Sequence, residues 1–321
     1  MRTLIIIFSL LFLFNATNGQ SWEKIYGLSG RFDAFQNLTE SYDSGFLVLG
    51  ATDYFPDTRG LLIKTDLNGN ILYQIQLGIE NINDELNLPF SIDNTVDGGS
   101  IICTAQGPSY LGDIGIIKLD ACGDLEWCKV FRTDDDPDWG VEIKQLSDGG
   151  YIMLTFQYGY YIYTPRIHLF RFDSSGELLW IEPYALESNY PLMNENMPED
   201  IVVTPEEDFF ISGHCYWCDE PLGSGGVHTQ CRIKSLAIMA DSSRYENWLR
   251  AYEADDTLSY SLGGWSTQYK SGSFYVGAID ESIWPYKPRL LKYDYEGNLI
   301  HDSIVEIPML DNKIAEGFMV N

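Results

Sequence analysis

Short runs in which apolar and polar residues alternate recur along the whole chain with a long period. The copy between residues 141 and 184 shows four of them: residues 141–146, a run that starts at Tyr151, a run that ends at Phe172, and residues 180–184. A period of two residues is typical of half-buried β-strands. The pattern therefore predicts an all-β protein built from a repeated group of four strands.

A turn of the form Asp-x-x-Gly follows one strand of each group. An Asp at the first position hydrogen-bonds the following backbone and a Gly at the fourth accepts a left-handed conformation, so the motif predicts a tight turn that closes a hairpin. Four clear copies occupy residues 66–69, 120–123, 173–176 and 294–297, and a degenerate copy lies around Asp241 in the longest interval. Five repeats are therefore visible.

Two further motifs keep step with this turn. A tight Asp-Gly-Gly turn leads into a strand at residues 97–99 and 148–150, with related copies at residues 43–45, 208 and 271–272. A strand headed by Trp follows the Asp-x-x-Gly turn at residues 127–131, 180–184 and 248–252, and residues 22–26 repeat it. Both patterns are those of hairpin strands.

Four strands in each repeat of about 54 residues correspond to the blade of a β-propeller. A parallel β-helix is the rival fold, but its coils are usually shorter and lack two tight hairpin turns. We expect one propeller repeat domain over residues 20–321. Residues 304–307 look like another edge strand and residues 314–320 like the start of another repeat. Either strands from the two termini share a closing blade, or the sequence is incomplete at its C-terminus.

The first residues have the features of a secretory signal peptide. Arg2 precedes an apolar stretch at residues 4–14, and the small residues Thr17 and Gly19 precede Gln20. This stretch is shorter than the roughly 20 residues that a membrane-spanning helix needs. We expect residues 1–19 to be removed, and the protein to be extracellular, attached to the cell surface or periplasmic, without a membrane span.

The chain is strongly acidic. It has 47 Asp and Glu against 20 Lys and Arg, which gives a net charge of −27. Such a field repels polyphosphates, so nucleic acid is excluded as a partner, whereas cations and basic partners fit. We expect a monomer or a part of a larger surface protein.

The three motifs together resemble a known group of proteins. Residues 22–27, 148–152 and 63–70 carry W-x-K-x-Y-G, D-G-G-Y-I and I-K-x-D-x-x-G-N patterns, and these are similar to the secreted repeat proteins common in Bacteroidetes. The resemblance covers nearly all of the chain after the signal peptide and implies a propeller fold. It also implies cargo of type IX secretion, although no sorting domain of the kind that often ends such proteins is recognisable here.

Acidic residues gather between the Trp-headed strand and the next strand of each repeat. The groups are residues 83–85, 134–138, 195–200 and 253–256. If these segments are equivalent loops of a propeller, they emerge on one face. Carboxylate oxygens suit calcium, although no group has the spacing of an EF-hand. The best candidate calcium ligands are Asp134, Asp135, Asp136 and Asp138.

The six cysteines favour disulfides because the chain is exported. Cys122 and Cys128 flank one hairpin and are placed for a local bridge. A second group combines a C-x-x-C with an H-x-x-C, and its members are His214, Cys215, Cys218, His228 and Cys231. We expect disulfides there, with a zinc site and free thiols as the alternatives.

No catalytic motif stands out. The chain has four histidines and no H-E-x-x-H, G-x-S-x-G or phosphate-binding loop. With 47 acidic residues, a carboxylate pair cannot be singled out. The sequence thus favours a non-catalytic binding or adhesion module that engages protein or glycan through loops on one propeller face. The alternatives are an extracellular polysaccharide hydrolase or lyase with carboxylates at the channel mouth, and a structural spacer in a larger adhesin.

Overall fold

The computed structural model consists of β-strands joined by turns. It describes residues 24–27, 33–52, 59–77, 86–107, 112–131, 138–157, 167–184, 193–218, 231–252, 261–280 and 287–305. Twenty strands lie within these residues. In the same part of the chain, no helix is long and apolar enough to cross a membrane. The signal peptide predicted at residues 1–19 lies outside it.

The strands form five sheets of four, and each sheet is one blade. The first blade contains β1 (Asp33–Glu40), β2 (Phe46–Thr52), β3 (Arg59–Thr65) and β4 (Ile71–Leu77). The second contains β5 (Leu86–Asn94), β6 (Ser100–Gly107), β7 (Asp113–Leu119) and β8 (Leu125–Phe131). The third contains β9 (Asp138–Gln145), β10 (Tyr151–Gln157), β11 (Ile167–Phe172) and β12 (Leu178–Tyr184).

The last two blades follow the same plan. The fourth contains β13 (Met193–Val203), β14 (Phe209–Cys218), β15 (Cys231–Ala240) and β16 (Glu246–Tyr252), and the fifth contains β17 (Ser261–Lys270), β18 (Ser273–Asp280), β19 (Lys287–Asp294) and β20 (Leu299–Ile304). Every pairing within a blade is antiparallel between consecutive strands. The predicted five repeats of four strands are confirmed.

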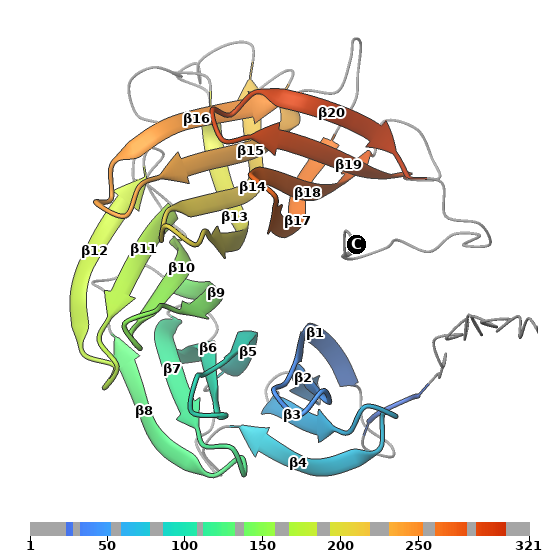
Figure 1. Ribbon diagram of the computed structural model, residues 1–321, viewed down its shortest axis with the longest axis vertical. Coiled ribbons are helices and arrows are strands. Elements are labelled where there is room, and N and C mark those ends of the chain that lie inside the picture. Colours follow the sequence, from blue (N-terminus) through green and yellow to red (C-terminus); the bar gives the residue numbers. More distant parts are fainter. Residues whose placement is uncertain are drawn as a thin grey trace, which may run out of the picture.

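The blades follow one another around a common centre, as Figure 1 shows. The first strand of each blade (β1, β5, β9, β13 and β17) lies nearest this centre, and the fourth strand lies at the rim. Each inner strand contacts the inner strand of the next blade, from β1 with β5 to β13 with β17. This is a β-propeller, and the antiparallel pairing excludes the parallel β-helix.

The Asp-x-x-Gly turns form as predicted. In the first blade, the Asp66 carboxylate accepts hydrogen bonds from the backbone N–H groups of Asn68 and Asn70, both at 2.8 Å, and Gly69 has a φ of 73°. The degenerate copy at Asp241 makes the same two backbone contacts. There Arg244 takes the place of the Gly, with a φ of 77°.

These turns also join neighbouring blades. An aromatic ring on the outer strand of one blade covers the turn glycine of the next, as Trp127 covers Gly176: a Cβ on that glycine would lie 2.7 Å from the indole ring. The same arrangement brings Tyr73 to Gly123 and Trp248 to Gly297. In the degenerate copy, the Arg244 guanidinium lies 5.2 Å from the centre of the Trp180 ring. The Trp-headed motif is therefore a packing element between blades.

A buried cation connects the other two motifs within a blade. The Lys or Arg two residues before the Asp-x-x-Gly aspartate reaches the first residue of the tight turn. Lys64 pairs with Asp43 at 2.5 Å and Lys118 with Asp97 at 2.9 Å, and Arg171 pairs with Asp148. The side chains of these cations are at most 9% exposed, so the aspartates supply the charge partner that burial requires.

The Asp43 carboxylate should therefore contribute stability that disappears in acid. The hydrogen bond from Lys64 lowers the pKa of Asp43 to about 2, so this contribution is present above pH 4 and is lost as the pH falls from about 4 to 2. We expect Asp43→Asn to lower the free energy of unfolding by about 1–2 kcal/mol at pH 7 and by much less at pH 2. Urea denaturation at both pH values measures this, with the exposed Asp124→Asn as control. An equal loss at both pH values would contradict the account.

Candidate active site

Each inner strand is interrupted at the same point by a bulge or irregularity in its pairing. The register with the second strand shifts between Phe35 and Asn37, between Pro89 and Ser91, and between Pro198 and Asp200. In β9 the shift leaves Val141 unpaired, and in β17 it lies between Leu262 and Ser266. Bulges bend a strand and re-aim its side chains, and they are common next to active sites.

The residue that follows each bulge is polar in all five blades. In the first four blades it pairs with the fourth residue of the second strand, and in the fifth blade with the fifth residue. These positions are therefore equivalent. We call them the inner ring, and its members are Asn37, Ser91, Glu142, Asp200 and Ser266.

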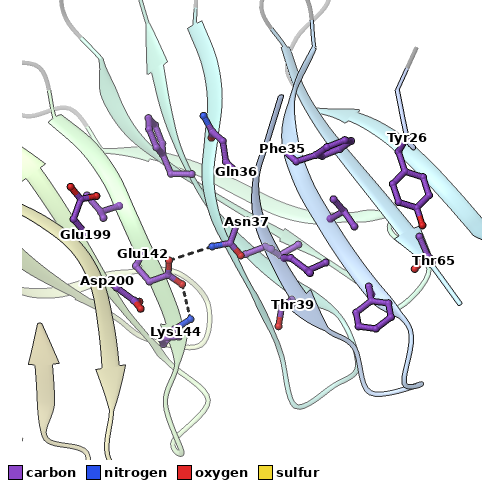
Figure 2. A pocket seen from close by; sticks show the side chains of 16 residues that line it. Tyr26, Phe35, Gln36, Asn37, Thr39, Thr65, Glu142, Lys144, Glu199 and Asp200 are labelled. Atoms are coloured by element: carbon purple, nitrogen blue, oxygen red, sulfur yellow. Dashed lines mark hydrogen bonds and ion pairs between the residues drawn. The ribbon is translucent and has the colours of Figure 1, made fainter. Parts of the chain in front are cut away.

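A cavity of about 890 Å³ lies at the centre, against the inner strands of the first four blades (Figure 2). Three members of the inner ring line it: Asn37, Glu142 and Asp200. Lys144 and Glu199 line it beside them. The bulges thus bring together polar side chains from three blades, which lie far apart in the sequence.

Glu142 is held by hydrogen bonds to both carboxylate oxygens. Lys144 Nζ donates to Oε1 at 2.6 Å, and the Nδ2 of Asn37, from a blade 105 residues away in sequence, donates to Oε2 at 3.5 Å. Figure 2 shows both contacts as dashed lines. Glu142 is only 6% exposed, so these contacts fix its orientation at the wall of the cavity.

Asp200 lies beside this group and differs from it in protonation. The backbone N–H of Thr267, in the next blade, donates to Oδ2 at 2.5 Å, and the N–H of Ile201 donates to Oδ1 at 2.8 Å. Burial and the negative charge of Glu142 outweigh these bonds and raise the pKa of Asp200 to about 7. Asp200 is therefore substantially protonated near neutral pH, which is the state a general acid needs.

A cation and a second pair complete the polar wall. Burial alone would lower the pKa of Lys144, but the charges of Glu142, Asp93 and Asp200 raise it, so Lys144 remains an ammonium group. Glu199 Oε1 lies 3.1 Å from Nδ1 of the buried His214. The wall therefore combines three carboxyl groups, one ammonium and one imidazole.

The calcium ligands predicted from sequence do not belong to this site. Asp134, Asp135 and Asp136 lie outside the described residues. Asp138 is the first residue of β9; it is buried, and its backbone N–H donates to the carbonyl of Gly112 at 2.8 Å. Among the described residues, no three His, Cys, Asp or Glu side chains are grouped to hold a metal ion. Calcium binding at residues 134–138 stays a prediction.

Two residues assigned to a loop on one face instead belong to the site. Glu199 and Asp200 lie within the inner strand β13 and line the central cavity. Glu142 and Lys144 were not identified as functional from the sequence. The signal that marks them is a charged residue inside a strand that is otherwise apolar, two to four residues before the tight turn.

The cysteine group is divided by the structure. Cys215 is a buried free thiol in β14, and burial raises its pKa to about 12, so it suits neither zinc nor a disulfide in this state. Cys122 and Cys128 are also free thiols, and the local bridge between them is absent. His228 lies outside the described residues. Cys218 and Cys231 are direct cross-strand partners in β14 and β15.

A disulfide between Cys218 and Cys231 is the prediction that remains from this group. Directly opposed residues of antiparallel strands have Cα atoms about 4.5–5.5 Å apart, within the range that a disulfide needs. We expect peptide mapping of the exported protein, alkylated without reduction, to recover these two cysteines as one linked pair and Cys215 as alkylated. Recovery of both as alkylated peptides, or one zinc ion per chain, would contradict this pairing.

Comparison with known proteins gives matches in structure alone. No protein-family model matches the chain, and no curated protein sequence matches it. An α-L-arabinofuranosidase of Fusarium graminearum, solved with arabinobiose, is similar to it with a TM-score of 0.56 and 9% identity over 85% of this chain and 80% of that one. A Penicillium chrysogenum α-L-arabinanase complexed with arabinobiose has a TM-score of 0.50 and 10% identity over 84% and 92%.

A second structure of a Fusarium graminearum α-L-arabinofuranosidase, with an iminosugar inhibitor, has a TM-score of 0.51 and 9% identity over 86% of this chain and 97% of that one. The chain also spans 55% of a eukaryotic initiation factor, at a TM-score of 0.39 that carries no argument. At these identities the matches show the propeller fold.

The expectation of a non-catalytic module that binds through loops on one face is wrong. The similar structures are propellers of glycan-cleaving enzymes. In this chain, a carboxyl with a raised pKa lies beside Glu142 in the central cavity. Both findings favour the alternative, an enzyme that acts on polysaccharide.

Proposed function

We propose that this protein is an extracellular glycoside hydrolase whose catalytic groups are Glu142 and Asp200. The observation that carries the proposal is their convergence: two carboxyl groups from equivalent positions of adjacent blades line one cavity, one held by an ammonium group and the other with a pKa near neutrality. Glycosidic bonds are cleaved by such a pair, one acid and one carboxylate. The extracellular location rests on the predicted signal peptide.

The two groups take different roles. Asp200 donates its proton to the glycosidic oxygen as the bond from that oxygen to the anomeric carbon breaks. Glu142 supplies the negative charge opposite the developing oxocarbenium ion, either by bonding to the anomeric carbon or by taking a proton from the attacking water. Water adds its hydroxyl to the sugar, and its proton restores Asp200. The anomeric configuration of the first product, read by NMR, distinguishes the two roles of Glu142.

The charges of the site favour a hydrolase over a lyase. A polysaccharide lyase removes a proton next to a uronate carboxylate, and that carboxylate must be neutralised for the proton to leave. Here three carboxyl groups line the polar wall, and the one ammonium, Lys144, is bound to Glu142. A uronate would meet repulsion instead of neutralisation.

The test is hydrolysis by the protein without its signal peptide. Because the similar enzymes were solved with arabinobiose, the panel begins with arabinobiose and linear arabinan and extends to xylan, β-glucan and galactan. We expect release of reducing ends from at least one of these, and a loss of about 10³-fold in kcat for Glu142→Gln.

The matched control is Glu177→Gln, which removes an exposed carboxylate whose partner is Lys129. This variant should cleave at the wild-type rate. No cleavage of any panel member by the wild type, or equal activity of Glu142→Gln and wild type, would contradict the proposed function.

A further inference from the structure

The central cavity has two chemically different halves. The half on β9 and β13 carries Glu142, Lys144, Glu199 and Asp200. The half on the first blade is largely apolar and aromatic, and Tyr26, Phe35, Phe46 and Val48 line it. Figure 2 shows the charged side chains on one side, Phe35 and Tyr26 on the other, and Asn37 between them. The polar half accounts for bond cleavage and leaves the aromatic half without a role.

The aromatic half offers ring surface to a ligand. Phe35 is 38% exposed although it lies on an inner strand. Its ring meets that of Tyr26 edge to face, with centroids 6.4 Å apart, and the Tyr26 hydroxyl donates to the Gly69 carbonyl at 2.8 Å. These contacts hold the two rings in place. Fixed aromatic rings at the wall of a cavity suit the apolar C–H face of a sugar.

A polar group without a partner lies in the same half. The side-chain hydroxyl of Thr65 is buried and has no hydrogen-bond partner, and Thr65 lines the cavity. In Figure 2 it lies below Tyr26. Leaving a buried hydroxyl unpaired costs free energy, and a sugar hydroxyl can act as the missing donor or acceptor. The aromatic half therefore has both the ring surface and the polar contact that a sugar unit uses.

The charges of the cavity restrict which sugars can bind. The carboxyl groups of Glu142, Glu199 and Asp200 face the space shared by both halves, and Lys144 is bound to Glu142. The whole chain adds a net charge of −27. A uronate or sulfate on either sugar would be repelled in this environment, whereas neutral hydroxyl groups can bond to the same carboxylates.

We infer that the cavity binds an uncharged oligosaccharide of at least two sugar units. One unit lies against Glu142 and Asp200, and its neighbour stacks on Phe35 and Tyr26 in the aromatic half. A volume of about 890 Å³ is near the upper end of the ~300–1,000 Å³ range of ligand pockets, so it has room for more than one ring. The inference rests on the proposed function, because it places the scissile bond between these two units.

The experiment measures binding without turnover. Isothermal titration calorimetry of Glu142→Gln uses neutral arabino-, xylo- and cello-oligosaccharides of one to four units and, for comparison, oligogalacturonides. We expect affinity in one neutral series to rise about tenfold or more from one unit to two, and the galacturonides to bind at least tenfold more weakly. Adding Phe35→Ala should remove most of the rise, whereas Phe35→Tyr should keep it. Val96→Ala, an exposed apolar residue outside the cavity, should leave it unchanged.

Each result decides the inference separately from the proposed function. An affinity that does not depend on chain length in any neutral series, a rise that survives Phe35→Ala, or equal binding of galacturonides overturns the inference, even if the wild type cleaves a glycan. Binding with the expected length dependence by a protein that cleaves nothing supports the two-unit cavity and rejects the hydrolase.

Discussion

Asp200→Asn should lower kcat about 10³-fold and remove the loss of activity that the wild type shows above pH 7. The proposed reaction needs Asp200 protonated, and its raised pKa of about 7 predicts that wild-type kcat/KM falls tenfold for each pH unit above that value. Asparagine cannot donate the proton, but its side-chain oxygen can still accept the Thr267 N–H. A pH–rate profile from pH 5 to 9 on the best panel substrate measures both effects.

The same substitution should raise stability at alkaline pH. Because the pKa of Asp200 is higher in the folded protein than in the unfolded chain, the folded state binds an extra proton between about pH 4 and 7, and stability falls as the pH rises through that range. Asparagine removes this penalty. Relative to the wild type, the variant should unfold with about 2 kcal/mol more free energy at pH 8.5 than at pH 4, an order-of-magnitude value reduced for partial exposure.

Asp302→Asn is the matched control for both measurements. Asp302 lies on the outer strand β20, and its carboxylate contacts Arg289 and Tyr252. Its pKa is lowered in the folded state despite the opposing effect of burial. This variant should lose stability and keep the alkaline fall in activity. If Asp200→Asn retained that fall, or lost stability equally at both pH values, the assignment of Asp200 as the acid would be wrong.

Gly176→Ala should destabilise the propeller by about 3 kcal/mol. Gly176 has a φ of 78°, which costs an L-residue about 1–2 kcal/mol, and a Cβ would lie 2.7 Å from the Trp127 ring. Overpacking of this kind typically adds about 1–3 kcal/mol. Urea denaturation of the variant and the wild type measures the difference.

Gly272→Ala separates the two contributions. Gly272 has a similar φ of 76°, but a Cβ there would have no neighbour within 4 Å. We therefore expect a loss of about 1 kcal/mol, from backbone strain alone. In a Trp127→Ala background, Gly176→Ala should also cost about 1 kcal/mol, because the clash is gone. Equal effects of Gly176→Ala with and without Trp127 would show that the ring does not rest on this turn.

The blade was predictable because its signals are local. The Asp-x-x-Gly turn is fixed by hydrogen bonds within five residues, as at Asp66, and such turns identify the repeat in one sequence. The degenerate copy at Asp241 was also recognised, although Arg244 replaces its glycine. What the sequence could not show is that the Trp-headed strand packs on the turn of the following blade, a contact between residues about fifty apart.

The site could not be predicted because it is made by the ring. Asn37, Glu142 and Asp200 become neighbours only when three blades surround the same centre, and the bulges that aim them leave no clear mark in the sequence. Glu199 and Asp200 were assigned to a loop because acidic residues cluster before them. Their burial in β13, which raises the pKa of Asp200, depends on packing between blades.

The central claim is that Glu142 and Asp200 act as a pair on one glycosidic bond. The most direct test compares kcat for the wild type, Glu142→Gln, Asp200→Asn and the double variant on the substrate that the wild type cleaves best. Groups that act as a unit give non-additive losses, so we predict that the double variant is about as slow as the slower single variant. Multiplied losses, or singles that cleave as fast as the wild type, would contradict the claim.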